Sequence, residues 1–150
     1  MRVLEKDDII HVLQTNYIGY LSFISNNEPY VIPITYYYNK DEDCIISYSS
    51  EGHKIEAMRM NKSVSLGVTN IMSINNWESV LIRGTFEELV GTHAKHQLHK
   101  FSVGIKKIIL IQENKAKQLI SDFSSKIATK GLPIVFRIKV SEIIGKSREF

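Results

Sequence analysis

Residues 17–38 read YIGYLSFISNNEPYVIPITYYY, and this stretch decides the fold class. β-branched and aromatic residues, which favour strands, fill residues 17–24 and 30–38. The polar residues 25–28 between them are typical of a turn. The sequence therefore predicts a β-hairpin. Pro33 lacks an amide hydrogen, so its strand is expected to be an edge strand, to carry a bulge, or to face a ligand at that point.

Sequence patterns also predict the helices and strands of the rest of the chain. Charged residues precede helical spacing over 6–14, and a second short helix is expected to start near Gly52. Helical patterning runs over 92–127, with breaks expected at Gly104 and Gln112. Further strands are predicted over 44–49, 63–71, 77–89 and 134–140. Six short strands with few helices predict a mainly β fold, a closed antiparallel β-barrel with helices outside it, in a single domain spanning 1–150.

Composition narrows the class of protein. The chain has 150 residues, 43% of them hydrophobic, and one cysteine, so no internal disulfide can form. No apolar run approaches the roughly 18 to 20 residues of a membrane span, and the cytoplasm is the expected location. Residues 1–91 carry a net charge of −5 and residues 92–150 a net charge of +8. With few aromatic residues among the later lysines, solvated helix faces are expected there and no nucleic acid.

Residues 47–54, SYSSEGHK, carry the strongest chemical signal. Hydroxyls end a strand, Gly52 stands at the turn, and Lys54 falls in the first turn of the next helix. Free amides and a positive charge at a helix N-terminus suit an anion, and a phosphate would fit. The alternative is a solvent-exposed lysine in a turn.

Other candidates have plainer explanations. His93, His96 and His99 could share a metal on one helix face, but we expect an exposed basic helix and no metal site. Cys44 is expected to be a small core residue. Trp77 suits a core, an interface or a ring-shaped ligand. Tyr36 to Tyr38 must point to alternating faces, so at least one of them is expected on the outside or at an interface.

The order of these motifs resembles a known family. The matching stretches are residues 28–36, 51–56, 61–65, 77–80 and 83–85, with 144–146 at the closing strand. Together they resemble the flavin-binding split-barrel proteins, and among them the pyridoxamine 5′-phosphate oxidase-related, nitroimidazole-resistance (Nim-type) branch. The resemblance covers residues 3–90 well, while 92–130 match little and are treated as a helical insertion.

The resemblance implies a homodimer of six-stranded split barrels with FMN in a groove between the subunits. By position, Ile32, Pro33 and Ile34 would lie along the isoalloxazine ring. Five residues would surround the phosphate, namely Tyr48, Ser49, Ser50, His53 and Lys54. Trp77 and Ser79 would approach the ring from the partner chain. Ser47 departs from the branch, many members of which carry a histidine near this position.

The leading functional hypothesis is an FMN-dependent oxidoreductase that uses NAD(P)H to reduce a small acceptor, with no residue assigned as an acid or base. The alternative is a non-catalytic protein that stores or senses FMN, or that holds haem through His53 or the histidines at 93–99. Pyridoxamine phosphate oxidation itself is disfavoured, because the arginines that would bind the substrate phosphate cannot be placed.

Overall fold

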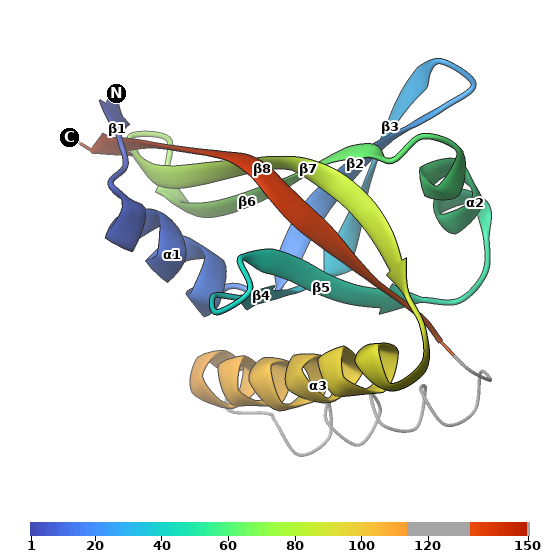
Figure 1. The fold of residues 1–150 in the computed structure, drawn as a ribbon. Coiled ribbons are helices and arrows are strands. Elements are labelled where there is room, and N and C mark those ends of the chain that lie inside the picture. Colours follow the sequence, from blue (N-terminus) through green and yellow to red (C-terminus); the bar gives the residue numbers. More distant parts are fainter. Residues whose placement is uncertain (114–132, 150) are drawn as a thin grey trace.

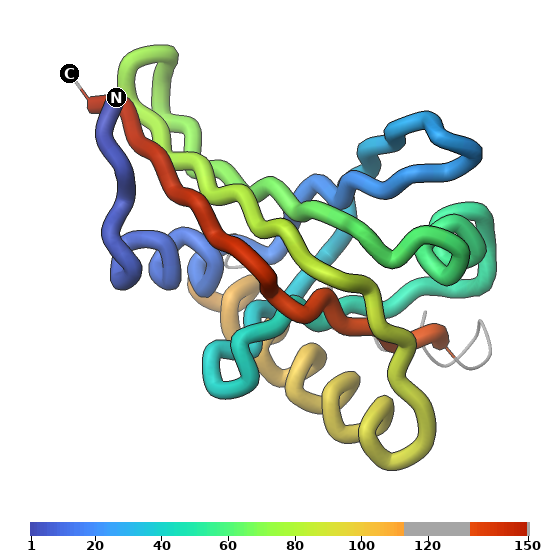
Figure 2. Tube along the Cα trace, turned by 45° about the horizontal axis from the view of Figure 1, so that its top comes forward, coloured from blue at the N-terminus to red at the C-terminus, as the bar shows by residue number. Residues whose placement is uncertain are grey.

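The computed structural model describes residues 1–113 and 133–149. The elements in this part of the chain are β1 (Arg2–Val3), α1 (Lys6–Thr15), β2 (Ile18–Ser25), β3 (Glu28–Thr35), β4 (Tyr37–Asn39), β5 (Cys44–Ser49), α2 (His53–Met60), β6 (Ser63–Ser73), β7 (Asn76–Leu89), α3 (Gly91–Glu113) and β8 (Ile134–Glu149). The strands form one antiparallel sheet in the order β3-β2-β6-β7-β8-β5-β4, and β1 pairs with β8. The sheet curls round on itself, with α1, α2 and α3 outside it (Figures 1 and 2).

The predicted hairpin is β2 and β3. Asn26 and Asn27 both adopt positive φ angles, 52° and 62°, in the two-residue turn that reverses the chain. Asparagine tolerates this left-handed conformation, and such turns match the twist of the flanking strands. Residue pairs from Ile18↔Thr35 to Ser25↔Glu28 fix the register. Since β3 stands at the end of the strand order, Pro33 lies on an edge strand, which is one of the alternatives that its missing amide hydrogen left open.

The strand predicted over 30–38 is two strands, β3 and β4, because Tyr36 leaves the sheet between them. Its backbone N–H donates to the Tyr17 carbonyl at 2.9 Å, and its hydroxyl donates to the Leu13 carbonyl at 2.8 Å. Tyr36 is fully buried beneath α1, and burial raises the pKa of its hydroxyl. The side chain thus closes the barrel end that α1 covers.

Two hydrophobic clusters hold the elements together. The larger one fills the barrel, and its fully buried members include Leu21, Leu66, Ile82, Phe136 and Ile138. The smaller one lies between β5 and α3 and is built from Cys44, Ile46, Phe101 and Ile105. Cys44 is therefore a core residue, as expected, and burial raises the pKa of its thiol to about 11.

Helix α3 runs without a break through Gly104, so the break predicted there is wrong. A Cβ on Gly104 would lie 2.2 Å from Cε1 of Tyr37, so the glycine lets this tyrosine pack directly on the helix. The helix also continues through Gln112, where the other break was predicted, and residues 114–127 of that prediction lie outside the described residues.

The tyrosine run is more buried than expected. Tyr36 and Tyr38 are buried in the barrel, and Tyr37 is half-buried against α3. Because α3 covers the second face of β4 and β5, none of the three is left on an open surface.

None of the described helices is long and apolar enough to span a membrane.

Candidate functional site

The residues predicted to bind an anion lie at the turn between β5 and α2. Ser49 ends β5, Ser50 follows in the loop, and Lys54 lies in the first turn of α2. The Ser49 hydroxyl donates to the Ser50 carbonyl at 3.0 Å. Ser49 and Lys54 are half-buried, whereas Ser50 is exposed. Lys54 makes no ion pair with any described residue. The turn therefore combines hydroxyls with a cation that the described part of the chain does not neutralise.

The N-terminus of α2 is open to a ligand. No side chain caps the helix at Gly52, and the first intrahelical bond runs from the Glu56 N–H to the Gly52 carbonyl at 3.1 Å. The amides of the first turn are consequently free, at the positive end of the helix dipole. A Cβ on Gly52 would meet nothing within 4 Å, and its φ of 169° is an extended conformation that any residue adopts. The turn therefore has free amides and open space beside Gly52.

Arg59, which lies outside the turn between β5 and α2, holds that turn in position. Arg59, on the last turn of α2, forms a two-pronged ion pair with Glu51 at 2.7 and 3.0 Å and also pairs with Glu88 on β7. Hydrogen bonds from Arg59 lower the pKa of the Glu51 carboxyl. Arg59 thus ties the loop before α2 to the barrel, and this role was not anticipated from the sequence.

The unpaired edges of β3 and β5 meet beside this turn. Ser47 to Ser49 pair only with β8, and β3 pairs only with β2, so each strand keeps one free edge. The Ser47 hydroxyl donates to the Thr35 carbonyl at 2.7 Å, which joins the two edges at one point. Ser47 is buried, and its hydroxyl holds the two strands together at this point.

The predicted ring-binding residues lie on β3. Ile34 is buried and Ile32 half-buried against the barrel core, whereas Pro33 is exposed on the opposite face. A flat ligand beside this strand would therefore meet the free backbone edge of β3 rather than the side chain of Ile34.

Two of the residues predicted to surround the phosphate, His53 and Tyr48, have rings that pack against other parts of the chain. The His53 ring packs edge-on against Tyr30 and Phe23, with centroids 5.2 and 5.8 Å away, and its Nε2 lies 3.0 Å from the Ser25 hydroxyl. Tyr48 packs edge-on against Phe101 of α3 at 5.4 Å, on the other face of β5 from Ser47. The backbones of His53 and Tyr48, but not their rings, border the turn.

Trp77 and Ser79 lie on β7, opposite Ile71 and Thr69 of β6, and both are half-buried. Their side chains share the outer face of the barrel, whereas the turn lies beyond the end of β5. One chain therefore does not gather all ten predicted residues into a single site.

The outer face also carries a row of apolar residues that sequence reasoning missed. The register aligns Pro33, Tyr20, Gly67, Leu81 and Ile144 across five neighbouring strands. Tyr20 is 51% exposed, Leu81 41% and Ile144 38%. A sheet face that meets only water is normally polar. The signal was present in β2, where Ile18 and Tyr20 occupy the positions that a solvated strand would give to polar residues.

The three histidines of α3 lie on an exposed helix face, as the sequence predicted. His93, His96 and His99 are all exposed. Within residues 1–113 and 133–149, no three histidine, cysteine or acidic side chains are grouped closely enough to hold a metal ion.

The fold is that of a split barrel, and comparisons place the chain among known proteins. Residues 5–147 match the family described as pyridoxamine 5′-phosphate oxidase, and the chain belongs to this family. An uncharacterized protein of Rhizobium meliloti (strain 1021) is 27% identical over 149 residues, covering 98% of this chain and 95% of that protein.

Solved structures agree with this assignment. An FAD-binding protein from Mesorhizobium loti superposes with a TM-score of 0.72 at 26% identity, over 99% of this chain and 97% of that one. A candidate 5-nitroimidazole antibiotic resistance protein from Bacteroides thetaiotaomicron superposes with a TM-score of 0.67 at 20% identity, over 96% and 85% of the two chains. The latter likeness shows the fold alone, so membership of the Nim-type branch stays a prediction.

Proposed function

We propose that this protein is an FMN-binding oxidoreductase that takes electrons from NAD(P)H and passes them to a small acceptor. The observation that carries the proposal is the turn between β5 and α2, where one short segment holds free helix amides, two serine hydroxyls and Lys54, which has no ion pair with a described residue. An amide cluster at a helix N-terminus with an added lysine is a favourable environment for a phosphate dianion. FMN carries such a phosphate on a flexible ribityl chain.

In this proposal the flavin ring lies along the free edge of β3. From the turn, the two free strand edges converge at the Ser47–Thr35 contact, so a ligand anchored at Lys54 would extend beside Ile32 to Ile34. The backbone groups on that edge have no strand partner in the described chain and can bind a polar ring edge. A bound flavin supplies the redox chemistry, while the residues named here bind it and orient it.

A homodimer would complete the site. The row from Pro33 to Ile144 leaves an apolar surface on the outer face, and Gly67 leaves a hollow in it, because a Cβ there would meet nothing within 4 Å. Large exposed apolar patches on a soluble domain favour self-association, and a two-fold axis would use the same patch twice. Tyr36 and Tyr38, which the sequence analysis considered for an interface, are buried in the barrel and do not contribute, and Val80 on β7 is buried there too.

FMN and FAD share the phosphate that the turn would bind. The Mesorhizobium loti protein is described as FAD-binding. The proposal of FMN rests on the single anion site at Lys54, because the second phosphate of FAD would call for further cationic groups. The mass of the released cofactor distinguishes the two.

The experiment starts from the purified protein as isolated. Heat releases the cofactor, mass spectrometry identifies it, and the absorbance of the intact complex is followed under anaerobic conditions after addition of NADH or NADPH. Bleaching of an FMN spectrum supports the proposal. A bound flavin that neither nucleotide reduces would favour a storage or sensing role. Absence of flavin after reconstitution with FMN would refute the proposal.

A further inference from the structure

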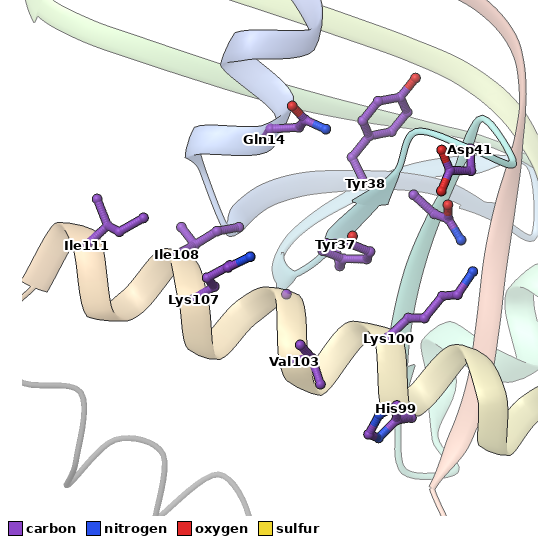
Figure 3. Close-up of a pocket in the computed structure, with 12 residues that line it drawn as sticks. Gln14, Tyr37, Tyr38, Asp41, His99, Lys100, Val103, Lys107, Ile108 and Ile111 are labelled. Atoms are coloured by element: carbon purple, nitrogen blue, oxygen red, sulfur yellow. The ribbon is translucent and has the colours of Figure 1, made fainter.

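A cavity lies on the side of the molecule where α3 packs. It has a volume of about 540 Å³ and is enclosed by the end of α1, by β4 and its following turn, and by α3 (Figure 3). None of the ten residues predicted for the flavin lines it. Its size falls within the range of small-molecule sites, roughly 300 to 1,000 Å³.

The walls of this cavity are partly apolar. The Tyr37 ring forms one wall where it packs on Gly104, and Ile108 and Ile111 continue the surface along α3. Ile111 is 80% exposed. The residues that dock α3 on the sheet belong to a different stripe of the helix, with Phe101 and Ile105 at its centre. Packing of α3 on β5 therefore gives no reason for an isoleucine at position 111.

The polar groups of the cavity that have no partner among the described residues include a tyrosine hydroxyl and a lysine ammonium. The Tyr37 hydroxyl makes no hydrogen bond there, and the Lys107 ammonium makes neither a hydrogen bond nor an ion pair, although Lys107 extends toward Tyr37 (Figure 3). Lys100 is different, since its Nζ lies 3.8 Å from Glu42. Burial and the nearby Asp41 raise the pKa of Tyr37, so its hydroxyl stays protonated and can donate.

We propose that this cavity binds a small aromatic carboxylate. The aromatic ring would lie against Tyr37 and Ile108, and the carboxylate would accept hydrogen bonds from the Lys107 ammonium and the Tyr37 hydroxyl. Of the two lining lysines, Lys100 is paired with Glu42, whereas Lys107 has no ion pair with a described residue, so a carboxylate bound beside Lys107 would gain one. A neutral ring would leave Lys107 unpaired. The proposal is independent of the flavin, since the two sites share no residue.

The test measures binding of 2-naphthoate by equilibrium dialysis against the purified protein with the flavin it carries. Lys107→Gln is expected to weaken binding about tenfold, because it removes one charge-assisted contact. Lys107→Arg should restore most of the affinity. Binding of 2-naphthalenemethanol, which has the same ring without the charge, should be weaker and should not respond to Lys107→Gln.

Lys106→Gln is the matched control, because it removes the same charge one residue away from a side chain that does not line the cavity. This variant should bind 2-naphthoate like the wild type. Equal weakening by Lys106→Gln, no effect of Lys107→Gln, or no binding by the wild type would each overturn the proposal. Loss of binding in Lys54→Ala with retention in Lys107→Gln would place the anion at the turn before α2, and would overturn it too.

Discussion

The hydroxyl of Ser47 donates a 2.7 Å hydrogen bond to the backbone carbonyl of Thr35, and this contact joins two strands that share no ladder bonds. Thr35 ends β3, and Ser47 lies where β5 loses its pairing with β4. The opening between the two strand edges therefore begins at a fixed point. The geometry of any ligand beside β3 depends on this bond.

Ser47→Ala should lower the free energy of unfolding by about 1 to 3 kcal/mol, because the half-buried carbonyl of Thr35 would lose its hydrogen bond from the serine hydroxyl. Urea denaturation measures the change. The control is Ser141→Ala, since Ser141 is exposed and makes no hydrogen bond to another described side chain or backbone group. Equal stability of the two variants would show that the bond does not hold the strands together.

Lys54→Ala should weaken FMN binding about tenfold or more, since a charge-assisted contact of roughly 1.5 to 3 kcal/mol is removed. Fluorescence titration of the folded apoprotein with FMN measures it. Lys62→Ala provides the control, because this exposed lysine lies just past α2 and outside the turn. An unchanged FMN affinity in Lys54→Ala would show that the phosphate does not bind at this turn.

Trp77→Ala should weaken dimerisation and FMN binding together, because loss of a buried aromatic anchor at an interface commonly costs about 2 kcal/mol or more. Sedimentation with absorbance read at protein and flavin wavelengths follows both. Leu110→Ala is a suitable control, since Leu110 is an exposed apolar residue on α3, away from the outer face. A monomer that keeps its FMN would contradict the shared site.

Replacing His93, His96 and His99 together by Gln should leave metal content and flavin content unchanged, because all three side chains are exposed on α3. Elemental analysis and the visible spectrum check this. Stoichiometric zinc or haem in the wild type that the triple variant lacks would show that the helix face is a binding site.

Glu42 gives a pH-dependent prediction. Hydrogen bonding from Gln97 lowers the pKa of its carboxyl below the usual 4.5. The unfolded chain therefore binds the proton first, so this contribution to stability is complete above the unfolded pKa and is lost as the pH falls through the folded one. Glu42→Gln should be less stable than wild type at pH 7, and the difference should narrow below about pH 4.5.

Urea denaturation at a series of pH values measures this difference. Asp41→Asn in the same turn is the control, since Asp41 forms no ion pair within the described residues. A gap between Glu42→Gln and wild type that stays constant with pH would contradict the assignment.

The sequence by itself determined what depends on neighbours along the chain. Alternating strand residues around an Asn-Asn turn are enough to specify the hairpin, because both the turn and the period of two are local properties. Residues 49–54 follow one another, so a strand end, a turn and a helix start place their hydroxyls and Lys54 in one short segment.

Tertiary structure decided whatever depends on partners from distant segments. The row of Tyr20, Gly67 and Leu81 exists only because β2, β6 and β7 pair in one register, and a shift of one residue would turn those side chains inward. The His53 ring packs against Phe23 and Tyr30 of the hairpin, and the Tyr48 ring packs against Phe101 of α3, so aromatic contacts with distant segments set their orientations. Periodicity assigns a side chain to a face of its own element, but only the packing of elements decides what that face meets.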